Sequence, residues 1–212
     1  LVARSKEEEV AIGCLLGLHG LKAPELLVCC VDATNLSRNL YLVLQARELG
    51  LNQVIALTMT DEAAPDAMSA GELSKLLDCP VVPVVGRTGQ GLDALKSAIA
   101  GAIGGKREPG LSFEPSEGLA ASIGRVREAL PSDWPKSDAV ALWALMSVCE
   151  GDELDVPASL RSAVQKEVPN DEAGAQLDDE VIAARYRYID ANVREPERAA
   201  PSRSMTERVD KV

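Results

Sequence analysis

Apolar positions in the first half of the chain form three short runs that predict strands. Residues 26–31 are apolar without interruption until Asp32, and residues 54–57 and 81–85 form two more runs. A run without polar alternation is typical of a parallel strand that is buried on both faces. We therefore predict one parallel sheet, in which Pro83 places the third strand at an edge or close to its own end.

Helical periodicity fills the stretches between and after these runs. The first stretch has Asn35 or Ser37 as its candidate N-cap, and Gly50 stands where a left-handed residue commonly ends a helix. Its apolar stripe consists of Leu36, Leu40, Val43 and Leu44. Two more helices are predicted over residues 70–77 and 92–103. The inward side chains of the second are expected to be Leu92, Leu95, Ile99 and Ile103.

The order of strand, helix and strand predicts where a ligand would bind. A right-handed crossover makes the first two strands parallel, so that both end at the same edge of the sheet. Ligands of open α/β sheets bind at that edge. Asp32 and Asp61 follow the first and the second strand. The sequence thus delivers two carboxylates to the expected ligand edge.

Beyond residues 104–115, which are rich in glycine, proline and charge, the pattern predicts only helices. Residues 139–149 are almost wholly apolar, which is typical of a helix in the middle of a bundle. The other predicted helices are residues 119–130, which Pro131 ends, residues 157–167, and residues 175–193 with Val181, Ile182, Tyr186 and Ile189 facing in. We expect an α/β domain over residues 1–107, a linker over 108–115, a helical domain over 116–193 and a further linker over 194–212.

The chain opens with a predicted helix instead of a strand. Ser5 and Glu8 have the spacing of a capping box, and Val10 and Cys14 lie on the apolar stripe of this helix. Residues 1–4 contain no methionine start and no strand of their own. We therefore expect the sequence to be a fragment of a longer protein.

Composition narrows the possible functions. The formal net charge of −11 argues against nucleic acid as a partner, because phosphate binding requires a basic face. The five cysteines lack C-x-x-C spacing, which indicates reduced, buried side chains of a cytosolic protein. His19 is the only histidine, so a histidine metal site or a catalytic triad is not expected. No apolar run approaches the roughly 18 residues of a membrane span, and no signal peptide is visible.

Two glycine-rich stretches do not match phosphate-binding fingerprints. In residues 86–91 the glycines follow the wrong spacing, and no lysine and hydroxyl pair comes after them. Residues 101–107 contain Gly105-Lys106, but their spacing is one residue short, and Arg107 stands where serine or threonine is required. We therefore interpret neither stretch as a phosphate loop.

Residues 31–42 read V-D-A-T-N-L-S-R-N-L-Y-L. This stretch is similar to V-D-A-T-N-L-E-R-N-L-Y-L of the family of ferrous iron transport protein B, a bacterial iron transporter linked to a GTPase. Residues 56–63 read A-L-T-M-T-D-E-A and resemble its guanine-reading motif A-L-N-M-x-D-E-A. Further likenesses cover residues 1–9, 82–92, 142–152, 182–186 and 204–212. The resemblance therefore spans nearly the whole chain.

The resemblance implies a fold, a location and a set of partners. The fold is a partial P-loop GTPase-like (Ras-like) α/β domain, whose parallel sheet has flanking helices, followed by a small all-α, GDI-like helical domain. This portion would lie on the cytoplasmic face of the bacterial inner membrane and couple GTP binding and hydrolysis to Fe(II) uptake. Its ligands would be GTP or GDP, with Mg²⁺ in the complete protein. Its partners would be its own membrane domain and small accessory iron-transport proteins.

The resemblance also places the nucleotide-binding residues. They are Thr58, Met59, Thr60, Asp61, Val85, Gly86 and Arg87. The Asp61 carboxylate can accept hydrogen bonds from guanine N1–H and the exocyclic amine, a donor pair that adenine lacks. The residues alone allow an alternative, in which Thr60 caps the next helix while Asp61 and Glu62 complement its dipole. The two roles are compatible.

Three of these positions depart from the family pattern. Thr58 stands where the family has asparagine, and a threonine hydroxyl can donate only one hydrogen bond. Val85 and Gly86 replace a serine and an alanine, although a contact from a backbone N–H survives both changes. The expected result is a weakened affinity for guanine.

Other GTPase parts are missing from the sequence. It contains no phosphate loop, no switch threonine and no D-x-x-G aspartate of a second switch, which supply the phosphate cradle and the Mg²⁺ ligands of P-loop GTPases. We expect no catalytic residue, no metal site and no GTP hydrolysis in this chain alone. Two functions remain: the cytosolic part of a GTP-driven iron transporter, or a degenerate, nucleotide-independent regulatory or scaffold module. Thr58 and Val85 favour the second, whereas Asp61, Gly86 and Arg87 favour the first.

Overall fold

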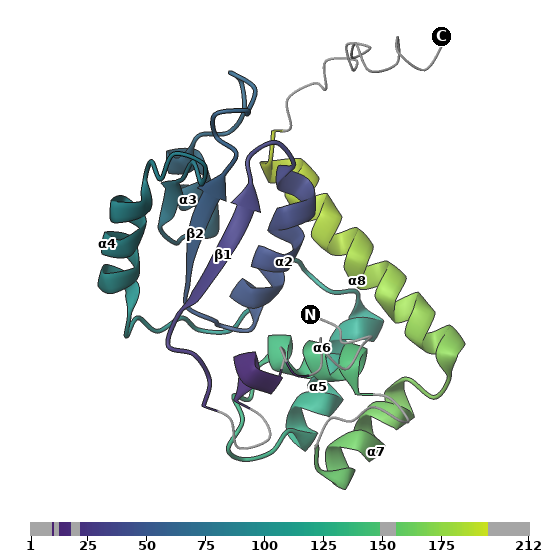
Figure 1. The fold of residues 1–212 in the computed structure, drawn as a ribbon. Helices are drawn as coiled ribbons and strands as arrows, with labels where there is room; N and C mark the ends of the chain where they lie inside the picture. Colours follow the sequence, from purple (N-terminus) through teal and green to yellow (C-terminus); the bar gives the residue numbers. More distant parts are fainter. Residues whose placement is uncertain (1–9, 11–12, 18–21, 149–155, 195–212) are drawn as a thin grey trace, which may run out of the picture.

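The computed structural model describes residues 10, 13–17, 22–148 and 156–194 (Figure 1). Within these ranges no helix is both long enough and apolar enough to cross a membrane. Several predicted features lie outside the described residues: the capping box at Ser5 and Glu8, the single histidine, Cys149 and the linker beyond residue 194.

Three parallel strands form one sheet in the order β1-β2-β3, which confirms the prediction from the apolar runs. They are β1 (Leu27–Asp32), β2 (Gln53–Thr58) and β3 (Val81–Pro83). In register, Cys29 lies beside Ile55, and Ile55 lies beside Val81. β3 is an edge strand and Pro83 is its last residue, a position that tolerates the missing proline N–H.

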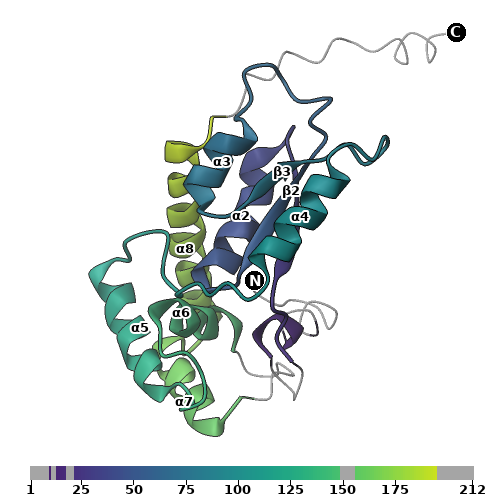
Figure 2. The same ribbon diagram turned by 90° about the vertical axis from the view of Figure 1, so that its left-hand side faces the viewer.

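Helices cover both faces of the sheet (Figure 2). α2 (Leu36–Glu48) and α3 (Ala70–Leu77) pack on one face, where their leucines share a core with side chains of β1 and β2. α4 (Leu92–Ala102) packs on the other face, against β2 and β3. The predicted stripe of α2 is buried, and Gly50 follows the helix with a left-handed φ of 74°. Asn35 is the N-cap of α2, although its side chain makes no capping hydrogen bond.

The described residues after 115 form helices and no strand, as predicted, and they pack around a core of their own. These helices are α5 (Glu117–Ala129), α6 (Asp138–Ser147), α7 (Ala158–Glu167) and α8 (Asp171–Asn192). α6 is central and buried on nearly all sides, and Ser137 caps it by accepting a hydrogen bond from Val140 N–H. α8 begins before the predicted residue 175, because the Asn170 side chain caps it at Ala173 N–H.

α8 belongs to both halves of the molecule. In Figure 1 it runs from the bundle of α5, α6 and α7 back along α2. Val181 lies in the core of the helical half, whereas Ile189 and Val193 lie in the core beneath the sheet. The last helix therefore holds the two halves together.

The expectation that the first strand is buried on both faces is wrong. Along β1, Cys29 and Val31 are buried, but Val28 is 39% exposed and Cys30 is also exposed. β1 is an edge strand, and α4 packs on β2 and β3 instead of on β1 itself. One face of β1 is therefore open, and the cysteines are not uniformly buried.

Two other helix faces also differ from the predictions. Leu92 and Ile103, at the two ends of α4, are 41% and 58% exposed. α4 has 11 residues and β3 only 3, so the helix extends beyond the strand that it covers. Near the N-terminus, Val10 and Cys14 are exposed, while Leu16 packs against the core of the helical half. The stripe predicted for that helix was thus placed on the wrong face.

Two of the four side chains predicted to face inward on α8, Val181 and Ile189, are buried, whereas the other two are exposed. Ile182 and Tyr186 are 37% and 38% exposed, whereas Val181, Arg185 and Ile189 are buried. The apolar pattern did not reveal this inward face because a charged residue, Arg185, lies in the middle of it. A buried arginine requires an oppositely charged partner, and the neighbouring sequence does not contain that partner.

Candidate functional site

The candidate site lies at the carboxyl edge of the sheet, where the chain leaves β2 and β3. Because the strands are parallel, residues 58–61 and 84–91 emerge on the same side. Val84 N–H donates to the Leu57 carbonyl oxygen over 2.7 Å and extends the strand pairing up to this edge. The structure thus brings together the two segments that the sequence predicted for the site.

Thr58 is half-buried at the end of β2 and connects it to β1. Its hydroxyl donates to the Val31 carbonyl oxygen over 3.1 Å, and its own carbonyl oxygen accepts from Ala33 N–H over 3.0 Å. The single donor of this side chain is therefore engaged within the sheet. Only the lone pairs of the hydroxyl remain for a ligand.

Met59 and Thr60 turn the chain away from the strand. Met59 has a left-handed φ of 54°, which costs a non-glycine residue roughly 1–2 kcal/mol. Glu62 N–H closes the turn by donating to the Met59 carbonyl oxygen over 3.1 Å. The next helix is α3, and its N-cap is Ser69, so Thr60 and Asp61 do not start a helix. The helix-capping alternative for these two residues is therefore wrong.

Asp61 and Arg87 connect the two loops of the site. Asp61 Oδ2 lies 3.5 Å from Arg87 Nη2, with the arginine side chain 81% exposed and the aspartate side chain 35% exposed. Exposed ion pairs of this kind stabilise a fold little and are easily opened by a ligand. The Asp61 carboxylate is thus available to accept hydrogen bonds.

The loop after β3 is held by its own backbone. Val85 is buried; its N–H donates to Gln90 O over 3.0 Å, and its carbonyl oxygen accepts from Gly89 N–H over 2.9 Å. Gly91 has a φ of 85°, and a Cβ there would lie 2.0 Å from the Pro83 carbonyl oxygen, so only glycine fits. Gly86 faces open space, and its N–H donates to no acceptor within the described residues.

Asp32, the other carboxylate at this edge, has a structural role. Its Oδ1 accepts from Thr34 N–H over 2.8 Å and from the Thr34 hydroxyl over 2.7 Å. This Asx-type turn shapes the start of α2. The carboxylate left for a ligand is therefore that of Asp61.

The arrangement is suited to binding a planar polar group. It offers a carboxylate as an acceptor and the Gly86 N–H as a donor on adjacent loops of a preformed edge. Among the residues that the structure describes, no cluster of three or more His, Cys, Asp or Glu side chains could hold a metal ion. We assign no role to Mg²⁺ at these residues.

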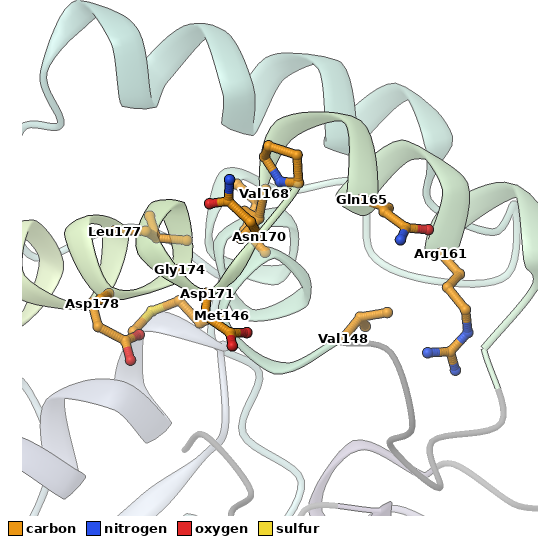
Figure 3. A pocket seen from close by; sticks show the side chains of 13 residues that line it. Met146, Val148, Arg161, Gln165, Val168, Asn170, Asp171, Gly174, Leu177 and Asp178 are labelled. Carbon is orange, nitrogen blue, oxygen red and sulfur yellow. The ribbon is translucent and has the colours of Figure 1, made fainter.

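A separate hollow of about 390 Å³ lies in the helical half, between the ends of α6, α7 and α8 (Figure 3). Met146, Val148 and Leu177 supply apolar side chains, while Arg161 and Asp178 lie toward opposite ends. None of the predicted site residues lines this hollow. It therefore adds nothing to the site at the sheet edge.

Comparison with protein families places the first part of the chain. Residues 1–99 match the family described as ferrous iron transport protein B. An Fe(2+) transport protein A/Fe(2+) transporter FeoB fusion protein of Porphyromonas gingivalis is 53% identical over 74 residues, which are 34% of this chain and 9% of that protein. The Fe(2+) transporter FeoB of Escherichia coli K12 is 37% identical over 131 residues, 60% of this chain and 16% of the transporter. The chain thus matches about a sixth or less of these relatives.

Solved structures show the same fold over most of the chain. The cytosolic domain of L. pneumophila FeoB is 26% identical with a TM-score of 0.71, covering 90% of this chain and 73% of that domain. The cytosolic domain of the T. maritima FeoB iron transporter, in its GMPPNP form, is 25% identical with a TM-score of 0.68. That match covers 88% of this chain and 71% of the T. maritima domain. The α/β half with its parallel sheet and the helical half are therefore those of such cytosolic domains.

Proposed function

We propose, since residues 1–99 match the family described as ferrous iron transport protein B, that this chain is the cytosolic guanine-nucleotide-binding portion of a ferrous iron transporter. In the complete protein, GTP binding and hydrolysis are coupled to Fe(II) uptake. Residues 1–107 form part of the GTPase-like domain, 108–115 the linker, 116–193 the helical domain, and 194–212 lead toward the membrane domain.

The meeting of two loops at the sheet edge carries this proposal. Guanine presents a carbonyl acceptor beside two donors, N1–H and the exocyclic amine. The Asp61 carboxylate suits the donor pair, and the Gly86 N–H suits the carbonyl oxygen. Adenine offers the opposite pattern at these positions, so the pair of groups selects the base. When guanine binds, the base replaces the exposed Arg87 side chain as the partner of the Asp61 carboxylate.

Thr58 and Val85 set the strength of the site. The Thr58 hydroxyl donates to Val31 instead of toward the edge, so it replaces an asparagine amide only in part. Val85 is buried and contributes its backbone, whereas Met59 and Thr60 contribute the turn that presents Asp61. We therefore assign this chain a weaker guanine site than the family pattern provides.

Phosphate and Mg²⁺ binding are assigned to other parts of the complete protein. The sequence has no G-x-x-x-x-G-K-[ST] segment, and the described residues hold no suitable cluster of metal-binding side chains. We assign no hydrolytic step to the residues of this chain.

The proposed partners follow from the same family. They are the protein's own membrane domain, Fe(II) as the transported substrate, and a small accessory iron-transport protein, on the cytoplasmic face of the bacterial inner membrane. The P. gingivalis relative, a fusion of transport protein A with the transporter, supports the accessory partner.

One observation favours a second candidate, a nucleotide-independent scaffold. Thr58 and Asp61 both have partners within the chain, namely Val31 and Arg87. A sheet edge whose polar side chains already have partners within the protein can keep its structure after the ability to bind a nucleotide has been lost.

The replacement Asp61→Asn in the complete protein separates the two candidates. An amide at this position cannot accept from both guanine donors, but its N–H₂ can donate to the additional carbonyl of xanthine. We expect calorimetric titration to show weakened GDP binding and strengthened XDP binding. Asp66→Asn, an exposed carboxylate in the following loop, serves as the matched control and should change neither affinity. An unchanged preference for GDP in Asp61→Asn would contradict the assignment of Asp61.

A further inference from the structure

An ion pair is buried between the two halves of the molecule. Glu48 is the last residue of α2, and Arg185 lies in the middle of α8; their side chains are 3% and 6% exposed. Glu48 Oε2 accepts from Arg185 Nη2 over 2.7 Å and from Nε over 3.1 Å. Each charge therefore finds its partner in the other half of the molecule.

Glu48 also holds the segment that connects the halves. Its second oxygen, Oε1, accepts from the Ser112 hydroxyl and from Ser112 N–H, the latter over 3.3 Å. Its backbone carbonyl oxygen accepts from Gly110 N–H over 2.9 Å. One carboxylate thus joins α2, α8 and the linker.

Arg185 is held in a single orientation by Tyr41. Its Nη1 donates to the Tyr41 hydroxyl over 3.4 Å, and its guanidinium lies 5.7 Å from the centre of that ring. Tyr41 stacks in turn on Tyr186, with ring centres 5.1 Å apart. Burial by itself would lower the pKa of Arg185, but the Glu48 carboxylate and the Tyr41 hydroxyl raise it, so the guanidinium stays charged.

The other end of α2 is tied to the candidate nucleotide site. Ala33, just before the helix, donates its N–H to the Thr58 carbonyl oxygen over 3.0 Å. α2 then runs without interruption from Leu36 to Glu48. The helix therefore forms a continuous connection from the Thr58 edge of the sheet to Glu48.

We propose that the Glu48–Arg185 pair is the joint through which α2 carries occupancy of the nucleotide site to α8. This inference rests on the proposed function, because it assumes that a guanine nucleotide binds at Thr58 and Asp61. A buried ion pair is satisfied in one geometry only, so α8 follows α2 instead of sliding along it. Glu48 acts as a positioning residue and touches no ligand.

α8 has a second attachment that offers a competing route. At its C-terminal end, Arg194 pairs with Glu72 at the start of α3, and Arg194 N–H lies 3.4 Å from Met68 Sδ. α3 follows the loop that contains Asp61, so this contact could also report on the site. The test must therefore separate Glu48 from Glu72.

Hydrogen exchange of α8 with and without GDP, in the complete protein, tests the proposal. In the wild type, saturating GDP should slow amide exchange in the second half of α8 by about fivefold or more, the lower end of typical allosteric coupling. Glu48→Gln removes the charge but keeps the shape, and Arg185→Lys keeps the charge but loses the two-point contact. Both variants should bind GDP and lose most of the protection.

Two control variants carry the same Glu→Gln change. Glu167 pairs with Arg125 inside the helical half. The variant Glu167→Gln should therefore keep the wild-type response of α8 to GDP. Glu72→Gln should also keep the wild-type response. If Glu72→Gln loses the GDP-dependent protection of α8 while Glu48→Gln retains it, the coupling runs through α3 and the proposal is overturned. Calorimetry on each protein separates the two inferences. GDP binding without any change in α8 refutes the joint alone, whereas absence of GDP binding by the wild type refutes both.

Discussion

Carboxylates and hydroxyls at the sheet edge divide into those that hold the chain and those that remain available. The Asp32 carboxylate is engaged by Thr34, and the Thr58 hydroxyl by Val31. Among the residues that the structure describes, Asp61 contacts only an exposed arginine, at 3.5 Å. A side chain that already makes short hydrogen bonds must give them up to bind a ligand, so availability decides which acid serves the site.

The replacement Thr58→Asn should strengthen nucleotide binding in the complete protein. An asparagine amide offers two donors and reaches further than the threonine hydroxyl. We expect GTP and GDP to bind about tenfold more tightly, equivalent to one restored hydrogen bond of roughly 1.4 kcal/mol. Hydrolysis at saturating GTP should barely change, since base contacts are equal in the ground and transition states.

Calorimetry of both nucleotides on both proteins measures this effect. Ser97→Asn introduces the same amide on the exposed side of α4, outside the two loops of the site, and serves as the control, with no gain expected. If neither the wild type nor Thr58→Asn binds GTP or GDP, the scaffold function replaces the transporter-GTPase function.

At the scale of elements, Arg107 shows how a local sequence likeness can mislead. Residues 101–107 resemble a phosphate loop of the wrong length. In the structure the Arg107 guanidinium donates to the carbonyl oxygens of Leu77 and Asp78, over 3.2 and 3.0 Å, and pairs with the Asp78 carboxylate. It therefore satisfies the C-terminal end of α3, which supports the interpretation of this stretch as something other than a phosphate loop.

β1 offers a test of its open face through two adjacent cysteines. Burial, together with the nearby Cys79 and Cys30, raises the pKa of the Cys29 thiol to about 11, whereas Cys30 lies on the exposed face. At pH 8 only about one Cys29 in a thousand is a thiolate, the reactive form. Alkylation of the folded chain should therefore modify Cys30 and leave Cys29 intact.

Peptide mass spectrometry after brief treatment with iodoacetamide reads out both positions. In denaturant the two cysteines should react at similar rates, which controls for peptide recovery. Equal modification in the folded chain would mean that the face of β1 carrying Cys29 is not covered by α2 as described.

At the scale of the whole molecule, α8 makes two cores dependent on each other. Its first half contributes Val181 to the helical core, and its second half contributes Ile189 and Val193 to the core under the sheet. Between these two halves of the helix, Arg185 is buried at an inward position where an apolar side chain would be expected. Apolar contacts thus fasten both ends of the helix, and the ion pair sets its register.

Two isoleucines of α8 give a matched test of this role. Ile189 is 1% exposed and Ile182 is 37% exposed. Ile189→Ala should lower the free energy of unfolding by about 2–5 kcal/mol, because it leaves a cavity in the core of the α/β half. Ile182→Ala should cost about 1 kcal/mol or less. Urea denaturation of both variants measures the loss of unfolding free energy. Equal losses would mean that Ile189 does not belong to that core.

The order and type of the elements could be predicted from local patterns in the chain. Three parallel strands, the bounds of α3 at residues 70–77, and the central place of α6 were all predicted from apolar runs, helical spacing and caps. These signals act over one or two turns or a few strand positions, so they can be identified in the local sequence. The strand pattern also placed Asp61 at the sheet edge, whereas the loop at residues 85–87 was placed by the family resemblance, and the role of both in base binding stays a prediction.

Which face of each element is covered could not be predicted in the same way, because it depends on how the elements pack. Val28 and Cys30 lie open because β1 is an edge strand, and Ile182 lies outside because Arg185 takes the inward position. Arg185 and its partner Glu48 are 137 residues apart. Burial of a charge depends on a partner brought near by the fold, and burial of an apolar side chain depends on a neighbouring element. Neither is encoded in the local pattern, so both become visible only when the chain is folded.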